Sequence, residues 1–325
     1  MGEFELIRRH FQRAAGGPSV ALGIGDDCAL LNPSPGHQLA ISSDMLVEGR
    51  HFFPDVHPQA LGHKALAVNL SDLAAMGARP LGFTLALALP HADEAWLRGF
   101  SDGLLALADA HACPLVGGDT TRGPLNICIT VFGEVLPGRA LRRDAARPGD
   151  DLYLSGRTGE ARLALERQRG TPWASAARPD DGCCERLERP TPRLALGRAL
   201  AGLDGWEDRA PAAIDLSDGL AGDLGHILRA SGVGADIRLT DLPVAPPLRG
   251  LPEAQRLECL LHGGDDYELL FTAPPSARGA IAAAGTASQT PVQRIGTITP
   301  QTGLRQTRAD GVTEPLSATG FDHFT

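Results

Sequence analysis

The sequence predicts an α/β protein of two domains, and three observations carry this prediction. The chain has 325 residues, about the length of two domains. Its 43% hydrophobic residues suffice for a sizeable core, and strand-like runs alternate with segments of helical periodicity. A proline-glycine turn at Arg147–Asp150 separates two such stretches, so the expected domains span residues 1–147 and 148–325.

The elements expected in the first domain begin with a strand at Gln38–Ser43 that leads into Asp44. Pro58–Met76 predicts a helix, because proline lies in its first turn and Gly77 follows its end. The remaining expected elements are a strand at Leu81–Leu89, an amphipathic helix at Asp93–Ala112, and strands at Pro114–Val116 and Asn126–Val135 with a glycine-rich turn between them.

The second domain is expected to open with a strand at Asp151–Leu154. Gly170–Pro192 is rich in proline, glycine and charge, which predicts a loop. The other expected elements are a helix at Arg193–Leu203, a strand at Ala212–Asp215, a helix at Asp218–Ala230, and strands at Glu268–Thr272 and Val292–Ile298.

Charge and hydropathy exclude several classes of partner. The 30 basic and 39 acidic residues give a net charge of −9, which argues against binding to nucleic acid or an anionic membrane. Apolar stretches such as Leu81–Leu89 are much shorter than a membrane helix, and the first residues lack the apolar core of a signal peptide. The six cysteines show no zinc-ligand spacing. We therefore expect a cytoplasmic protein.

Lys64 is the only lysine, and it lies in the segment His63-Lys64-Ala65. A Walker-type phosphate loop requires Gly-Lys-Ser/Thr, and a protein-kinase fold requires lysine in a Val-Ala-Ile-Lys context. Neither motif is present in the sequence. A protein with this sequence must therefore bind ATP, if it does so, by another route.

Aspartates recur in expected turns, beside glycine or serine, just after expected strands. We call these segments the expected acidic turns. The segments are Gly25-Asp26-Asp27, Ser42-Ser43-Asp44, Gly117-Gly118-Asp119-Thr120, Asp215-Leu216-Ser217-Asp218-Gly219 and Gly263-Gly264-Asp265-Asp266. Strand ends in α/β folds converge on one edge, where ligands bind. Carboxylates gathered there repel one another unless cations intervene, and Mg²⁺ suits such oxygen ligands together with phosphate oxygens. Aspartate and glycine are also ordinary turn residues, so a purely structural role stays open for each segment.

Asp72 is unusual because it lies near the C-terminus of an expected helix, where both helix propensity and the helix dipole disfavour an anion. It is a candidate site residue, although a solvated helix face would also explain it. Ser217 is placed to cap the helix expected from Asp218, or to bind phosphate at that helix N-terminus. His51 and Arg143 are further candidates, the arginine for nucleotide phosphate, with ordinary structural or surface roles as the alternative.

Seven segments, taken in order, resemble the thiamine-monophosphate kinase family. They are GIGDDCAL (23–30), ISSDMLVEGRHF (41–52), KALAVNLSDLAAMGARP (64–80), VGGDTTRGP (116–124), AIDLSDGL (213–220), GGDDYELLF (263–271) and GFDHF (320–324). The resemblance spans nearly the whole chain, and its third and fourth segments are long and specific. The wider superfamily includes aminoimidazole ribonucleotide synthetase and selenophosphate synthetase, which use ATP without a Walker-type loop.

This resemblance implies a two-domain α/β fold of the aminoimidazole ribonucleotide synthetase type. The N-terminal domain would bind metal and ATP and form a homodimer through its sheet, and the C-terminal domain would complete the active site. The implied reaction is ATP-dependent phosphorylation of thiamine monophosphate to thiamine diphosphate, with several Mg²⁺ ions as cofactors and ATP as co-substrate.

The resemblance also implies roles for individual residues. The implied Mg²⁺ ligands are Asp27, Ser42, Ser43, Asp44, Asp72, Asp119, Asp215 and Asp218. The implied nucleotide contacts are Gly118, Asp119, Arg143 and Ser217, and the implied contacts to thiamine monophosphate are His51, Asp265 and Phe321. The sequence departs from the family pattern twice: Asp265 stands where glutamate is familiar, which shortens its reach, and Ser43 stands where threonine is common, which keeps the hydroxyl.

A phosphate acceptor needs no general base, because its second pKa of about 6 leaves it largely dianionic at neutral pH. We therefore assign no proton-transfer residue and expect direct in-line transfer assisted by Mg²⁺ and Arg143. Two alternatives stay open at this point. One is a synthetase of the same superfamily, because Cys28 beside Asp27 invites comparison with selenophosphate synthetases. The other is a non-catalytic nucleotide-binding maturation factor.

Overall fold

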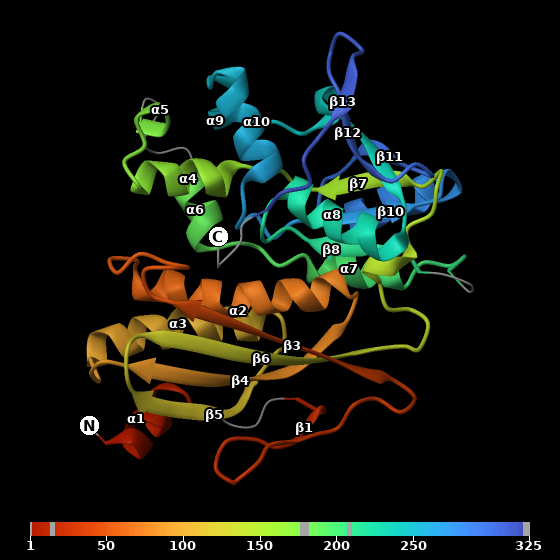
Figure 1. Cartoon of the computed structure of the whole chain (residues 1–325). Coiled ribbons are helices and arrows are strands. Elements are labelled where there is room, and N and C mark those ends of the chain that lie inside the picture. The colour runs from red at the N-terminus through yellow and green to blue at the C-terminus, as the bar shows by residue number, and fades with distance from the viewer. Residues whose placement is uncertain (1, 14–16, 176–181, 207–209, 321–325) are drawn as a thin grey trace. The chain divides into compact units, whose positions relative to one another are not determined.

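The computed structural model describes residues 2–13, 17–175, 182–206 and 210–320, and these form two units (Figure 1). The first unit contains the chain up to Leu73 and from Ala78 to Pro137. The second contains Ala74–Gly77 and the chain from Gly138 onward. Both units combine a β-sheet with helices, which confirms the predicted α/β class.

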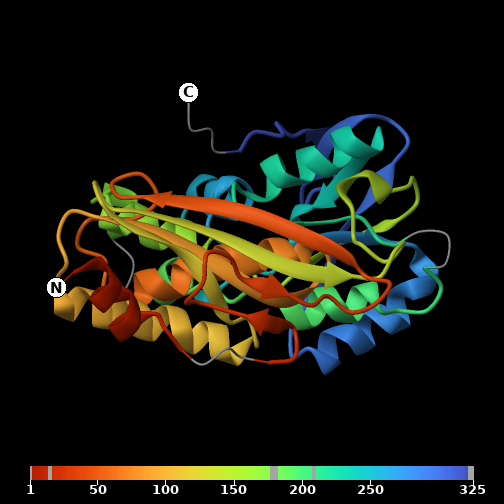
Figure 2. The same ribbon diagram turned by 90° about the horizontal axis from the view of Figure 1, so that it is seen from below.

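The N-terminal unit is built on a four-stranded sheet of order β3-β6-β4-β5. Its strands are β3 (Gln38–Val47), β4 (Arg79–Leu89), β5 (Leu115–Arg122) and β6 (Asn126–Val135). Strand β6 runs antiparallel to both of its neighbours, whereas β5 runs parallel to β4. Helices α2 (Pro58–Ala75) and α3 (Glu94–Ala110) cover one face of this sheet (Figures 1 and 2).

Period-two alternation along the strands separates a covered face from an open one. In β6 the buried Ile127, Ile129 and Val131 alternate with half-buried Cys128 and Thr130. On the open face of β3, large apolar side chains are more than half exposed: Leu39 at 53%, Ile41 at 61% and Met45 at 53%. Strand β3 therefore presents large apolar side chains on the face of the sheet that α2 and α3 leave uncovered.

Helices α2 and α3 pack with their backbones in contact. A Cβ atom added at Gly103 would lie 1.9 Å from the carbonyl oxygen of Gln59, and one added at Gly62 would lie 2.1 Å from that of Phe100. Only glycine allows such an approach, so these two positions set the distance between the helices. Shorter elements complete the unit: α1 (Glu3–His10), β1 (Val20–Leu22) and β2 (Leu30–Leu31), none of which we predicted.

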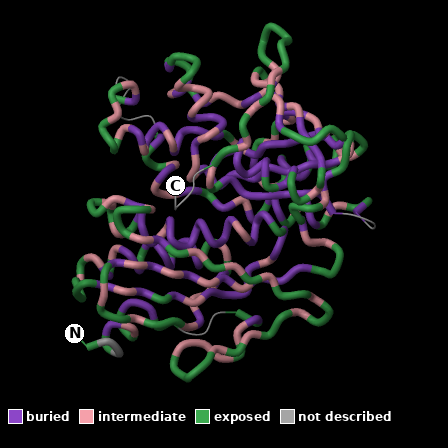
Figure 3. Tube along the Cα trace, viewed as in Figure 1, coloured by how far each residue is buried: buried purple, intermediate pink, exposed green. Residues whose placement is uncertain are grey.

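The C-terminal unit contains a seven-stranded sheet of order β13-β12-β9-β11-β7-β10-β8. Its strands are β7 (Asp151–Ser155), β8 (Ala213–Asp215), β9 (Gly234–Arg238), β10 (Leu269–Ala273), β11 (Val292–Thr299), β12 (Gly303–Thr307) and β13 (Thr313–Pro315). Among the described strands of this sheet, only β12 and β9 pair in parallel. Strands β7, β8 and β10 are buried along their whole length (Figure 3).

The α-helices of the C-terminal unit are α4 (Glu160–Gln168), α5 (Pro172–Ser175), α6 (Cys183–Glu188), α7 (Leu194–Ala201), α8 (Leu220–Ser231), α9 (Pro246–Arg249), α10 (Glu253–His262) and α11 (Arg278–Ala287). Six of them, α4, α5, α6, α8, α9 and α10, contribute side chains to one large apolar core with these strands. Three short 3-10 turns are η1 (Arg143–Ala145), η2 (Leu239–Asp241) and η3 (Pro275–Ala277).

Two of the expected acidic turns are strand interiors. Asp44 lies within β3, because the alternating residues after it continue the ladder with β6 as far as Val47. The Gly117–Thr120 segment lies within β5, so the turn expected there is wrong. Gly118 is required there for a different reason. Its φ is +146°, and a Cβ atom on it would lie 1.9 Å from the carbonyl oxygen of Leu85 on β4. Glycine here allows close strand approach rather than chain reversal.

Three further expectations are corrected. The helix expected from Asp218 begins at Leu220, with Gly219 as its N-cap at a φ of +110° and no side-chain cap, so Ser217 does not cap it. The loop expected over Gly170–Pro192 contains α5 and α6 in its described parts. Both sheets are largely antiparallel, so convergence of parallel strand ends does not explain where the acidic residues lie.

Candidate active site

In the N-terminal unit, three predicted site residues meet between β3 and α2. Ser42 and Asp44 are two residues apart on β3, so both side chains point to the side covered by helices. The Ser42 hydroxyl donates to Asp72 Oδ2 on α2 at 2.5 Å, and the Asp44 amide donates to Asn69 Oδ1 at 3.1 Å. Asp72 therefore faces the sheet, and the solvated-face alternative for it is wrong.

This cluster, which we call the β3–α2 site, has the electrostatics of an incomplete cation site. Burial, followed by the charge of Asp72, raises the pKa of Asp44 to about 7. Two carboxylates and a hydroxyl supply hard oxygen donors of the kind that Mg²⁺ prefers. Among the described residues, no group of three or more His, Cys, Asp or Glu side chains is arranged to hold a metal. Two carboxylates and a hydroxyl are fewer ligands than Mg²⁺ takes, so an ion held here would also bind water or phosphate oxygens, as Mg²⁺ usually does.

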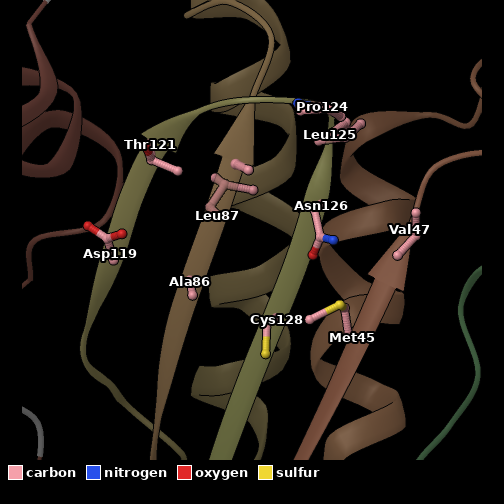
Figure 4. Close-up of a pocket in the computed structure, with 11 residues that line it drawn as sticks. Met45, Val47, Ala86, Leu87, Asp119, Thr121, Pro124, Leu125, Asn126 and Cys128 are labelled. Atoms are coloured by element: carbon pink, nitrogen blue, oxygen red, sulfur yellow. The ribbon is translucent and has the colours of Figure 1, made fainter.

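Asp119 lies on the other face of the same sheet. Met45, Cys128, Ala86 and Asp119 form one row across the four strands. They line a shallow open pocket with Thr121, Asn126 and Val47, and Figure 4 shows Asp119 and Thr121 at its β5 edge. The structure thus does not bring Asp119 together with the β3–α2 site in the described chain. Gly118 precedes it on β5, at the close approach to β4.

The remaining predicted residues of the N-terminal unit are dispersed. Ser43 points to the open face, where its hydroxyl lies 2.9 Å from Thr130 Oγ1 and donates to the carbonyl of Ile129 at 3.2 Å. Asp27 is exposed in the turn after Gly25. The ring of His51 folds back on the end of β3, where Nδ1 accepts a hydrogen bond from the Val47 amide at 3.0 Å.

In the C-terminal unit, two predicted segments are joined directly by backbone hydrogen bonds. The Asp265 amide donates to the Ser217 carbonyl at 2.9 Å, and the Tyr267 amide donates to the Leu216 carbonyl at 2.8 Å. A Cβ atom at Gly264 would lie 2.4 Å from the Ser217 oxygen, so glycine is needed for this contact. The expected nucleotide and metal residues Ser217 and Asp218 are therefore brought next to the expected acceptor residue Asp265.

Asp223 was missed by the sequence analysis and lies in this site. It is 2% exposed in the first turn of α8, and its Oδ2 accepts a hydrogen bond from the Asp218 amide at 3.1 Å. Burial raises the pKa of Asp223 to about 7. The hydrogen bond from the Asp218 amide and the charge of Arg143 act in the opposite direction and lower it. Acidic residues are common in first turns of helices, so Asp223 gave no distinctive signal.

Arg143 is held beside this site by η1. Its backbone carbonyl accepts a hydrogen bond from the Ser231 hydroxyl of α8 at 2.8 Å, and the Ala146 amide donates to the same hydroxyl at 3.1 Å. The predicted residue Asp215 is buried at the end of β8, three positions before Asp218.

Phe321 lies outside the described residues. No helix in the described chain is long and apolar enough to cross a membrane.

Comparison with known proteins identifies relatives over the whole length. The family models "AIR synthase related protein, N-terminal domain" and its C-terminal counterpart match residues 25–135 and 147–307. The thiamine-monophosphate kinase of Escherichia coli (strain K12) is 48% identical over 326 residues, which cover 99% of this chain and 98% of the relative.

Two solved structures show the same architecture. The thiamine-monophosphate kinase from Stenotrophomonas maltophilia K279a matches with a TM-score of 0.81 and 46% identity, over 90% of this chain and 92% of that one. AaThiL complexed with AMPPCP and TMP matches with a TM-score of 0.73 and 28% identity, over 90% of this chain and 89% of that one.

Proposed function

Because the chain belongs to the AIR synthase related protein family and has full-length thiamine-monophosphate kinase relatives, we propose that it is itself such a kinase. It transfers the γ-phosphoryl group of ATP to thiamine monophosphate and forms thiamine diphosphate and ADP. The similarity to AaThiL, which is complexed with both AMPPCP and TMP, carries this proposal, because AMPPCP is an analogue of ATP.

The proposed sites are those expected from the family. Mg²⁺ is assigned to Ser42, Asp44 and Asp72 of the β3–α2 site. Further Mg²⁺ ligands are proposed on the family resemblance alone: Asp27, Ser43, Asp119, Asp215 and Asp218. Bound Mg²⁺ supplies positive charge that neutralises phosphate oxygens and brings two polyanions together. Residues 1–147 are proposed as the metal- and ATP-binding domain, and residues 148–325 as the domain that completes the site.

Two of the proposed contacts, Ser217 for the nucleotide and Asp265 for the acceptor, lie on the joined segments of the C-terminal unit. Arg143 and Ser217 would bind nucleotide phosphate, with Gly118 and Asp119 from β5. Asp265, His51 and Phe321 would orient thiamine monophosphate. The acceptor phosphate needs no base, so the protein has to place two anions in line and need not move a proton.

Selectivity for the acceptor tests the proposal. Purified protein with ATP and Mg²⁺ should release ADP with thiamine monophosphate, and very little with thiamine, because only the monophosphate supplies an ionised nucleophile. A coupled ADP assay across thiamine, its monophosphate and aminoimidazole precursors measures this directly. Comparable rates with thiamine and its monophosphate, or turnover only with an aminoimidazole precursor, would refute it.

The raised pKa of Asp44 predicts a pH-dependent response to Mg²⁺. Without a bound cation this carboxyl has a pKa of about 7 in the folded protein, above the usual aspartate pKa of 3.8. The folded state therefore binds more protons than the unfolded state between these values, so this group favours folding less as the pH rises. A bound cation must displace that proton, so its affinity increases with pH by up to about tenfold per unit below pH 7.

We expect millimolar Mg²⁺ to raise the melting temperature more at pH 8 than at pH 6, measured by differential scanning fluorimetry. Asp44→Asn should remove most of this pH dependence. Equal increases at both pH values in the wild-type protein would show that Asp44 does not bind the ion.

A homodimer formed through the open face of the N-terminal sheet is also proposed. Its support is the apolar row of Leu39, Ile41 and Met45 on β3, an exposed patch of the kind that marks protein interfaces. Sedimentation velocity tests it, since a monomer at micromolar concentration would exclude a stable dimer. The proposed compartment is the cytoplasm, which fits the six free cysteines.

A further inference from the structure

Residues 263–267, which we call the acceptor turn, adopt an unusual backbone for their sequence. Asp265 and Tyr267 have φ values of +64° and +49°, in the left-handed region that favours glycine. Aspartate tolerates this region, but a bulky tyrosine rarely adopts it. A conformation of this kind persists only where the surrounding structure holds it, and such positions concentrate at ligand sites.

Three contacts hold the acceptor turn. The amides of Asp265 and Tyr267 donate to the carbonyls of Ser217 and Leu216. Between them, both carboxylate oxygens of Asp266 accept from the Gly159 amide, at 3.0 and 2.9 Å. Asp266 is 2% exposed, so this bond is shielded from water. The backbone of the turn is thereby fixed on two sides, by the segment of Ser217 and by the N-terminus of α4.

The fixed backbone brings the side chains of Tyr267 and Asp265 together. The Tyr267 hydroxyl donates to Asp265 Oδ1 at 3.2 Å. The tyrosine is buried, with 8% exposure, whereas Asp265 is half-buried. A buried, rigid ring thus carries a donor to the carboxylate that lies nearer the surface.

We propose that Tyr267 is a positioning residue for the acceptor: its hydroxyl orients the Asp265 carboxylate that meets thiamine monophosphate. This inference rests on the proposed function, in which Asp265 contacts the acceptor. The cationic thiazolium ring of that substrate suits a carboxylate held in one orientation. Aspartate is one methylene shorter than glutamate, so its contact depends more strongly on how the side chain is oriented, and Tyr267 fixes that orientation in advance.

Tyr267→Phe tests the role because it removes only the hydroxyl. Loss of one hydrogen bond should raise KM for thiamine monophosphate by about three- to tenfold. The values of kcat and of KM for ATP should stay within about twofold of wild type, because a ground-state contact to one substrate is lost.

The chain has two tyrosines, so Tyr153 provides a matched control. Its hydroxyl donates to Asp151 Oδ2 at 3.4 Å within the core of the same unit. Tyr153→Phe should leave both KM values unchanged. An equal rise in KM for thiamine monophosphate in this control would mean that loss of any buried hydroxyl disturbs the unit, and would refute a specific role for Tyr267.

A double-mutant cycle separates positioning from packing. Asp265→Gly removes the carboxylate at a φ value that glycine accepts readily. If Tyr267 acts through Asp265, Tyr267→Phe should change KM by less than about twofold in the Asp265→Gly background. Two results would overturn the positioning role. One is that Tyr267→Phe raises KM for thiamine monophosphate by the same factor in the wild-type and Asp265→Gly proteins, and the other is that Tyr267→Phe alone leaves this KM unchanged. Wild-type protein that does not phosphorylate thiamine monophosphate would instead refute the proposed function itself.

Discussion

Asp72→Asn and Asp44→Asn should each lower kcat/KM by about two orders of magnitude or more, the scale expected when a preorganised electrostatic contact at a reacting phosphate is lost. Each substitution removes one negative charge from the β3–α2 site and keeps the size of the side chain. Ser42 Oγ still finds an acceptor in the amide oxygen at position 72, so the local hydrogen bond can persist. The loss of activity would therefore come from weaker cation binding and not from unfolding.

Stability in the absence of Mg²⁺ provides the internal check. Burial and the neighbouring Asp72 raise the pKa of Asp44, so the two carboxylates oppose each other in the metal-free protein. Either asparagine variant should then melt at or above the wild-type temperature without Mg²⁺, while gaining less than wild type when Mg²⁺ is added. Activity falls while intrinsic stability is kept.

Asp102→Asn is the matched control, because Asp102 is an exposed aspartate on the neighbouring helix α3. It should retain wild-type kinetics, because the substitution is the same but lies outside the site. Near-normal rates for both Asp44→Asn and Asp72→Asn at millimolar Mg²⁺ would contradict a metal-binding role. Activity loss accompanied by a large drop in melting temperature would point to a structural role instead.

Residue patterns predicted the long elements of the fold well, because their periodicity is strong. Helix α2 is observed over Pro58–Ala75, against the predicted Pro58–Met76, and β6 is observed over the predicted range. One kind of error falls where a glycine or an acid lies inside a strand. Gly117 and Gly118 have the composition of a turn, but the close approach of β5 to β4 is a tertiary constraint that local sequence does not display.

Residues of the candidate site stood out in the sequence where a residue type conflicts with its local structure. Asp72 was such a case, because aspartate is unfavourable near a helix C-terminus and the structure shows it facing Ser42. Asp223 and Tyr267 gave no such signal. The first occupies an ordinary first-turn position. The left-handed backbone of the second is held by the bond of its amide to Leu216 and by the bond of the neighbouring Asp266 to Gly159, both distant in sequence. Contacts between residues that are distant in sequence are determined by the fold and not by the local sequence.

Glu268 provides the test of that tertiary support. It is fully buried immediately after the acceptor turn, and it accepts hydrogen bonds from Arg186 Nη2 and Arg193 Nε, both at 2.7 Å, and from the Ser155 hydroxyl at 2.5 Å. These donors lower its pKa despite burial, so the carboxylate is charged at neutral pH. The Glu268 backbone carbonyl also accepts from the Leu216 amide at 2.9 Å, which ties it to the segment of Ser217.

Glu268→Ala should lower the free energy of unfolding by about 3–5 kcal/mol, because it leaves two largely buried guanidinium groups without their counter-charge. Urea denaturation measures this loss. Glu185→Ala is the matched control: Glu185 pairs with Arg189 at 3.2 Å on the surface, with its side chain 63% exposed, and its removal should cost at most about 1 kcal/mol. A loss for Glu268→Ala no larger than that of the control would show that the buried cluster contributes little to the stability of the unit. In that case the backbone hydrogen bonds of the acceptor turn would be its main support.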